Sequence, residues 1–258
     1  MDYETQRERD LVDQEIRIHK ESYDMLHQSA NLQSVPIVEP LGFFLNEDNT
    51  KAYQVMEYCE RSDLKGYINN MKKTGTEISE DDAWGLISQI CSITHKLHSL
   101  RIIHGDFKPE NILLTKDNQI KLCDFGFVKK INEGEDSVDS REFTMLYVAP
   151  ETFQNISPET NSHQKLKLTT AADIWTIGVV CYELLAKRHP FMNENDDQVS
   201  VMEFVRRVIE DEPAALPDQY SENLKALINR MLIKDPAQRI TAFEIHEWPE
   251  IQAKLEKK

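Results

Sequence analysis

Two short segments of the sequence bring acidic, basic and amide side chains close together. Residues 104–111 read HGDFKPEN, and the triplet DFG follows at 124–126. Phosphoryl transfer needs a carboxylate that orients the incoming hydroxyl group, a cation near the migrating phosphoryl group, and carboxylate or amide oxygens that hold magnesium. The side chains that supply this set are, in order, Asp106, Lys108, Asn111 and Asp124. Their types and spacing predict phosphoryl-transfer chemistry.

Apolar periodicity and turn residues predict the elements that must position these side chains. Residues 112–114 and 120–122 flank a polar turn and are expected to form a short hairpin between the two segments. The first segment follows a helix over 80–100. The remaining helices are expected over 5–28, 63–70, 173–187, 199–210, 221–233 and 241–255, with a further strand pair over 37–45 and 52–58. In the first helix the apolar positions are Leu11, Ile16, Ile18 and Met25.

Two polar stretches predict loops. Residues 131–142 are acidic and turn-prone. Residues 154–169 contain Ser, Asn, Pro and Lys, and we expect them to form a solvated insertion.

The composition excludes several classes of function. With 258 residues the chain can form one large domain or two lobes, and its formal net charge of −15 speaks against nucleic acid or a membrane as the main partner. Its four cysteines form no Cys-x-x-Cys pair, so neither a zinc site nor a disulfide framework is indicated. The first ten residues are charged, and the most apolar stretch, 174–186, is too short to cross a bilayer. A cytoplasmic or nuclear location fits these features.

Three later motifs extend the pattern. Residues 147–151 read YVAPE, residues 173–178 read DIWTIG and residues 235–239 read DPAQR. With the first two segments, they resemble the eukaryotic protein kinase family of the serine/threonine type, in family order, over about 11–248. In that family the three motifs end the activation segment, begin the central buried helix, and supply an arginine that pairs with the glutamate of Ala-Pro-Glu.

The resemblance implies an α+β fold with two lobes. Residues 1–58 would form a partial N-lobe, made of the helix that the family calls helix C and two strands. Residues 59–258 would form a mostly helical C-lobe that carries the catalytic loop and the activation segment.

The resemblance also implies catalytic roles. Asp106 would be the catalytic base, and Lys108 would reach the γ-phosphate of ATP, as in family members that act on serine or threonine. Thr144 resembles the threonine that bonds to the catalytic aspartate in those kinases. Asn111 and Asp124 would hold Mg²⁺, which prefers few carboxylates together with phosphate oxygens.

Further residues would bind the nucleotide if the resemblance holds. Met56 looks like the gatekeeper beside the adenine. The backbone groups of Glu57 and Cys59 would pair with the base, so their side chains would matter little. Leu113 would form the floor of the adenine pocket, and Cys123 would lie under the nucleotide.

Several positions have a structural interpretation as well. Asp63 would meet the ribose hydroxyl groups, and it is equally well explained as the N-cap of the next helix. Cys123 is either an ordinary small buried residue or a reactive thiol. Asp173 would hold the catalytic loop, and Glu151 would pair with Arg239, both in structural roles.

The sequence departs from the family pattern at three places. It has no glycine-rich loop and no Val-Ala-x-Lys strand. If Glu21 is the glutamate of helix C, its lysine partner belongs at or before Met1, so we expect the chain to begin after the third strand of the small lobe. Gly105 replaces the arginine of His-Arg-Asp, which in the family normally binds the phosphate group of a phosphorylated activation loop. Activation through phosphorylation of Ser137 or Ser140 is therefore disfavoured.

Three hypotheses remain. The main one is a serine/threonine protein kinase that uses Mg–ATP and a protein substrate, with a regulatory partner possible. The alternative is a pseudokinase or scaffold with weak or no transfer, because the glycine-rich loop and the lysine are absent. The third is a small-molecule kinase, since His-Gly-Asp-x-x-x-x-Asn occurs in aminoglycoside- and choline-kinase-like enzymes. Those enzymes lack the three later motifs found in this sequence.

Overall fold

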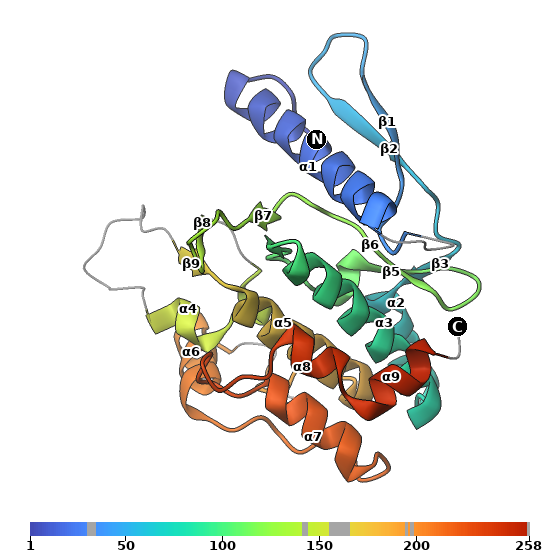
Figure 1. The fold of residues 1–258 in the computed structure, drawn as a ribbon, viewed down its shortest axis with the longest axis vertical. Coiled ribbons are helices and arrows are strands. Elements are labelled where there is room, and N and C mark those ends of the chain that lie inside the picture. The colour runs from blue at the N-terminus through green and yellow to red at the C-terminus, as the bar shows by residue number, and fades with distance from the viewer. Residues whose placement is uncertain (30–34, 141–143, 155–165, 194–195, 197–198, 257–258) are drawn as a thin grey trace.

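The structure is a computed structural model and describes residues 1–258 except 30–34, 141–143, 155–165, 194–195, 197–198 and 257–258 (Figure 1). Its helices are α1 (Gln6–Ser29), α2 (Leu64–Thr74), α3 (Glu80–Ser99), α4 (Pro150–Gln154), α5 (Thr170–Ala186), α6 (Val201–Glu210), α7 (Glu222–Met231), α8 (Ala242–His246) and α9 (Pro249–Leu255). Its strands are β1 (Pro40–Leu45), β2 (Ala52–Met56), β3 (Arg61–Asp63), β4 (Ile102–Ile103), β5 (Ile112–Leu114), β6 (Ile120–Leu122), β7 (Lys129–Lys130), β8 (Val138–Ser140) and β9 (Leu166–Leu168). Two 3-10 turns are η1 (Pro109–Asn111) and η2 (Met145–Tyr147). The predicted α+β class is confirmed.

Helix α5 lies at the centre of the larger, helical part of the molecule, where α2, α3 and α7 pack against it (Figure 1). Its side chains are buried on every face, among them the large rings of Trp175 and Tyr182. A helix that is apolar all round is stable only in such a core. Gly178 permits the close approach of α7, because a Cβ atom at this position would lie 2.8 Å from the Cβ of Met231.

Helix α1 and the β1–β2 hairpin form a smaller part of the molecule (Figure 1). The hairpin is antiparallel, with Leu45 opposite Ala52 beside the turn. Large apolar side chains such as Phe44 are exposed on it. Because a two-stranded sheet buries little surface, it depends on neighbouring elements for its stability. One such link is the hydrogen bond from the N–H of Val38 to the carbonyl of Leu122 in β6 (2.9 Å).

Three small antiparallel sheets surround the catalytic loop, residues 104–111. One has the strand order β3-β5-β6, and it contains the predicted hairpin over 112–114 and 120–122. The second joins β4, just before the catalytic loop, to β7, just after the DFG triplet. The third joins β8 to β9. Short strands therefore fix the loops that carry the predicted catalytic side chains.

The structure corrects three predicted elements. The helix expected over 241–255 is two helices, α8 and α9, which are separated at Trp248. Pro249 begins α9 because a proline has no N–H group to donate and its ring clashes with a preceding turn. The predicted loop 131–142 contains strand β8. Most of the expected insertion 154–169 lies outside the described residues, but its end forms strand β9 rather than a solvated loop.

Within the described part of the chain, no helix has both the length and the apolar character needed to span a bilayer.

Candidate active site

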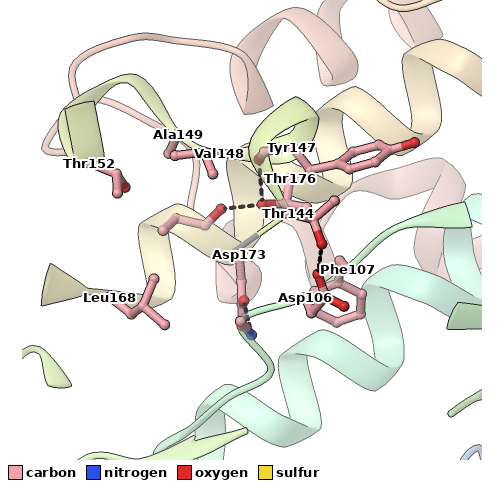
Figure 2. A pocket seen from close by; sticks show the side chains of 12 residues that line it. Asp106, Phe107, Thr144, Tyr147, Val148, Ala149, Thr152, Leu168, Asp173 and Thr176 are labelled. Carbon is pink, nitrogen blue, oxygen red and sulfur yellow. Dashed lines mark hydrogen bonds between the residues drawn. The ribbon is translucent and has the colours of Figure 1, made fainter. Parts of the chain in front are cut away.

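The carboxylate of Asp106 is the centre of a buried hydrogen-bond cluster. Its Oδ1 accepts a bond of 2.5 Å from the hydroxyl group of Thr144 (Figure 2). Its Oδ2 accepts bonds from Lys108 Nζ (2.5 Å) and from Asn111 Nδ2 (2.9 Å). Three donors on one buried carboxylate fix its orientation. The structure thus brings together all four predicted catalytic side chains, although Thr144 is 38 residues from Asp106 in the sequence.

Helix α5 holds the backbone of the catalytic loop through Asp173. The carboxylate of Asp173 accepts bonds from the N–H groups of His104 and Gly105, each 2.9 Å long. A third bond of the same length joins it to Nε2 of His98 on α3. A buried carboxylate needs such partners, and here they tie the loop that precedes Asp106 to the core helix. The structural role predicted for Asp173 matches these contacts.

Asp124 lies beside Asn111, and the two fit a magnesium site. The distance from Asn111 Nδ2 to Asp124 Oδ2 is 3.5 Å. Both bonds from Asn111 to Asp106 use the amide nitrogen, so Asp106 does not engage the amide oxygen. Asp124 has a φ of +62°, a conformation that is uncommon outside glycine and that recurs at functional sites. One carboxylate and one amide oxygen, with phosphate oxygens, suit Mg²⁺.

No cluster of three or more His, Cys, Asp or Glu side chains that would hold a metal ion occurs among the described residues. Magnesium at this site would therefore depend on phosphate oxygens for its remaining ligands.

A second carboxylate, that of Glu15 on α1, faces Asp124 across Gly126. A Cβ atom at Gly126 would lie 3.4 Å from Asp124 Oδ1 and 3.5 Å from Glu15 Oε2. Burial, and next the nearby charge of Asp124, raise the pKa of Glu15 above its ordinary value. Glu21, which the sequence suggested for this position, is exposed to solvent instead.

Sequence reasoning missed Glu15 because it considered only the apolar positions of α1, of which Ile18 and Met25 do pack partly buried against the core. The expected apolar position Leu11 is 50% exposed. The inward face is instead made by residues three and four apart along the helix, which are Val12, Glu15, His19, Ser22 and Leu26. Three of these five are polar, so a search for apolar periodicity could not find the face. The available signal was that the apolar residues Val12 and Leu26 lie on one helix face, with the three polar residues between them.

His19 connects α1 to the DFG triplet. Its ring stacks on Phe125 with centroids 4.8 Å apart and an angle of 5° between the planes. On the other side, Phe125 meets His104 edge-on at 5.6 Å. The Nε2 of His19 lies 2.7 Å from the carbonyl of Val38, and its Nδ1 lies 2.8 Å from Nε2 of Gln54. These contacts need one protonated ring nitrogen, and burial lowers the pKa of His19, so the neutral ring fits.

A cleft of about 1020 Å³ opens between α1, the hairpin and the DFG triplet. Its lining includes Met56, Cys123 and Asp124, three of the residues predicted for the nucleotide and the metal. Burial, and next the charge of Asp124, raise the pKa of Cys123 to about 12. The thiol is therefore protonated at neutral pH, which favours the interpretation of Cys123 as an ordinary buried residue over that of a reactive one.

Four other residues predicted for the nucleotide are not in this lining. The side chain of Glu57 pairs with Lys121, with 2.5 Å between Oε2 and Nζ. The carboxylate of Asp63 accepts a 2.7 Å bond from a backbone N–H in the first turn of α2, so it acts as the N-cap of that helix. Cys59 and Leu113 are half-buried.

The predicted pair of Glu151 and Arg239 forms at the end of the activation segment. Both oxygens of Glu151 bond to the guanidinium group of Arg239, at 2.7 and 2.8 Å. Arg239 also donates to the carbonyl groups of Ala171, Ile233 and Lys234. This buried arginine joins α4 to the start of α5 and to the chain after α7.

Comparison with known proteins agrees with this geometry. Residues 4–249 match the protein kinase domain. The chain is 32% identical over 236 residues to the carbon catabolite-derepressing protein kinase of Secale cereale. The aligned region covers 91% of this chain and 41% of that protein. It is 32% identical over 245 residues to the serine/threonine-protein kinase Nek6 of Oryza sativa, and this aligned region covers 95% of this chain and 42% of that protein.

A third similar protein is the serine/threonine-protein kinase Nek1 of Mus musculus, with 31% identity over 228 residues, 88% of this chain and 17% of that protein. The chain thus spans less than half the length of these three relatives. Because the protein kinase domain matches nearly the whole sequence and its motifs converge in space, the chain belongs to the protein kinase family.

Proposed function

We propose that this chain transfers the γ-phosphate of Mg–ATP to a serine or threonine hydroxyl group of a protein substrate. The observation that carries the proposal is the carboxylate of Asp106, which contacts Lys108, Thr144 and Asn111 at once. The names of Nek1 and Nek6, serine/threonine-protein kinases, support the choice of acceptor.

The roles of the side chains follow from their positions. Asp106 orients the substrate hydroxyl group and accepts its proton, while the hydroxyl oxygen bonds to the γ-phosphorus and the bond from that phosphorus to ADP breaks. Lys108 brings a positive charge to the transferred phosphoryl group. Thr144 holds the second oxygen of Asp106, so the carboxylate keeps one orientation during the reaction.

Magnesium, when bound, neutralises charge on the phosphates. Asp124 and Asn111 would hold it, Asn111 through its amide oxygen, which the bonds to Asp106 do not use. The contact between Asn111 and Asp106 would then link the metal site to the catalytic base.

We further propose that residues 1–58 act as a partial N-lobe over residues 59–258, with the adenine between them. Met56 would contact the adenine from the cleft, and backbone groups of Glu57 and Cys59 would pair with it. This placement is supported by the cleft, which both parts of the chain line.

A scaffold with weak or no transfer is favoured by one observation. The carboxylates of Glu15 and Asp124 face the same glycine. Burial, and next the charge of Asp124, raise the pKa of Glu15, although Arg7 and Lys129 line the same cleft. Two carboxylates that face each other oppose the binding of anionic phosphates unless Mg²⁺ or another cation lies between them.

Transfer of radioactive γ-phosphate to a mixture of serine- and threonine-containing peptides tests the proposal. Asp106→Asn keeps the size of the side chain but removes its charge. We expect it to lower kcat by on the order of 100-fold or more, while nucleotide binding stays unchanged.

Asp117→Asn, an exposed aspartate in the turn between β5 and β6, is the matched control and should keep wild-type turnover. Equal turnover in wild type and Asp106→Asn would show that Asp106 is not the base. Nucleotide binding without transfer in the wild type would favour the scaffold.

A further inference from the structure

A strand pair joins the activation segment to the chain just before α5. Strand β8 lies in the activation segment, and it pairs antiparallel with β9, with Val138 opposite Leu168 and Ser140 opposite Leu166. The sequence predicted loops at both places, so neither strand belongs to the motifs that define the site. Main-chain pairing of this kind restrains both segments without any charged group.

Leu168 anchors this pair to the catalytic loop. Its buried side chain packs in a small apolar cluster with Ile103 and Ile131, against which Val138 also packs. Ile103 ends β4, directly before the catalytic loop. One side chain of β9 thus shares an apolar cluster with residues of β4, the start of the activation segment and β8.

Leu168 also covers Gly105, the residue in the place of the family's arginine. Gly105 has a φ of +77°, and a Cβ atom there would lie 3.3 Å from Leu168 Cδ1 and 3.1 Å from the carbonyl oxygen of Phe127. A larger side chain at 105 would therefore displace Leu168. Leu168, Gly105 and Asp106 line one small pocket together with Asp173 (Figure 2).

The first half of the activation segment is held by hydrogen bonds from an arginine to main-chain carbonyl groups. The guanidinium group of Arg101 donates to the carbonyl oxygens of Asn132 and Glu135, at 2.6 Å each, and to that of Ile131 at 3.3 Å. In return, the N–H of Ile131 bonds to the carbonyl of Arg101 at 2.8 Å. Strand pairing, apolar packing and bonds from Arg101 to carbonyl groups thus hold both halves of the segment, and these contacts do not require a phosphate group.

We infer that Leu168 and strand β9 position the activation segment, and through Gly105 the catalytic Asp106, in place of a contact between arginine and a phosphate group. Leu168 is a positioning residue, since it acts through the backbone of the catalytic loop. The inference about Asp106 rests on the proposed function. The expected consequence is an activation segment that is ordered in the unphosphorylated protein.

Hydrogen exchange of the main-chain amides in β8 tests the ordering without any need for activity. The protein is treated with phosphatase, its mass is checked, and exchange is followed without nucleotide. We expect slow exchange in the wild type and fast exchange in Leu168→Ser. Lys167→Ala is the control, because this neighbouring side chain of β9 is exposed. It should exchange as the wild type does, and so should the conservative variant Leu168→Val.

Steady-state kinetics of the same proteins test the positioning. We expect Leu168→Ser to lower kcat by on the order of 10- to 100-fold, as small misplacements of catalytic groups do, with an unchanged KM for ATP. Leu168→Val should restore most of kcat. A loss of folding alone would instead lower the amount of active protein and leave kcat per folded molecule unchanged.

Fast exchange of β8 in the unphosphorylated wild type would overturn the inference, even if Leu168→Ser failed to fold. Equal kcat in wild type and Leu168→Ser would overturn the positioning role. If no variant transfers phosphate, the proposed function fails, while the exchange experiment still decides whether β9 orders the segment.

Discussion

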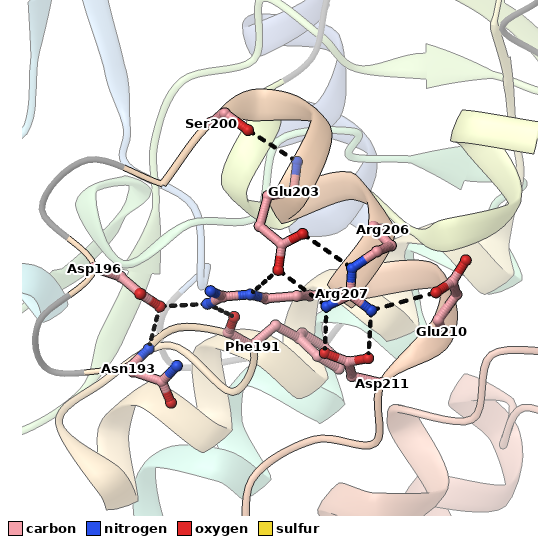
Figure 3. Close-up of polar contacts among 9 residues, drawn as sticks. All are labelled: Phe191, Asn193, Asp196, Ser200, Glu203, Arg206, Arg207, Glu210 and Asp211. Atoms are coloured by element: carbon pink, nitrogen blue, oxygen red, sulfur yellow. Dashed lines mark hydrogen bonds and ion pairs between the residues drawn. The ribbon is translucent and has the colours of Figure 1, made fainter.

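Two arginine clusters, one beside α5 and one on α6, use charge in different ways. Arg239 is fully buried, and its one carboxylate partner, Glu151, has 17% of its side chain exposed. Arg206 on α6 is 42% exposed and bonds to three carboxylates, those of Glu203, Glu210 and Asp211 (Figure 3).

The cluster with more ion pairs should contribute less to stability. Water and salt screen the charges on α6, and long exposed side chains lose freedom when they pair. At Arg239 water is excluded, because the side chain is buried and its guanidinium group lies 5.2 Å from the ring centre of Trp175. Removal of Arg239 takes an ion-pair partner from the part-buried carboxylate of Glu151, where water replaces it poorly. Burial, not the number of bonds, should decide the effect of a mutation.

The largest effect on stability is expected from Arg239→Ala. It removes an ion-pair partner of Glu151 and the donor of three carbonyl groups, so the free energy of unfolding should fall by about 3–5 kcal/mol. Denaturant unfolding measures this loss. Nucleotide affinity of the folded fraction should not change, because Arg239 does not line the cleft. Unchanged stability with lost affinity would contradict the structural role.

A smaller effect should come from pH at His189, a buried histidine just after α5. Its Nε2 lies 2.8 Å from the carbonyl of Leu146, and its Nδ1 accepts from the N–H of Phe191 at 3.2 Å. Burial lowers the pKa of His189 from 6.5 to about 4. The unfolded chain therefore binds this proton more readily than the folded chain does. The contribution of His189 to the free energy of unfolding is therefore complete above about pH 6.5. It is lost as the pH falls toward about 4, and the loss is on the order of 3 kcal/mol.

Denaturant unfolding at several pH values, with His189→Gln beside the wild type, isolates this contribution. Burial also lowers the pKa of His19 and of His104, so the wild type has a slope from several histidines. The slope should be clearly smaller in His189→Gln. It should be unchanged in His27→Gln, whose side chain is exposed. Equal slopes in wild type and His189→Gln would exclude His189 as a source of the pH dependence.

The smallest effect is expected from Arg206→Ala. Its carboxylate partners stay hydrated when it is removed, and Glu203 keeps its bond with Arg207. The melting temperature should hardly change and should become no more sensitive to salt. A loss as large as that of Arg239→Ala would show that exposure does not separate the two clusters.

Local motifs made the catalytic side chains predictable from the sequence. Asp106, Lys108 and Asn111 lie within six residues of one another, so one short segment reveals them. Contacts between distant segments were not predictable in this way. The β8–β9 pair joins two polar stretches with no strand pattern, and only the fold brings Leu168 to Gly105. At Pro249 the signal was present in the sequence, because a proline inside an expected helix marks a break.

The position of Glu15 shows a different limit. The inward face of α1 contains the buried polar side chains of His19 and Ser22, and His19 contacts both the hairpin and the DFG triplet. Apolar periodicity identifies a helix face that meets an apolar core, and it fails where the face meets a polar site.

The most direct test of the central claim is a thermal melt with and without saturating Mg–ATP. At a hundred times its dissociation constant, the ligand should raise the melting temperature by roughly 5–10 °C. The shift should require Mg²⁺, persist in Asp106→Asn and in the control Asp117→Ala, and disappear in Asp124→Ala. A cooperative melt that Mg–ATP does not shift, or a shift that Asp124→Ala retains, would contradict a magnesium–nucleotide site at Asp124 and Asn111.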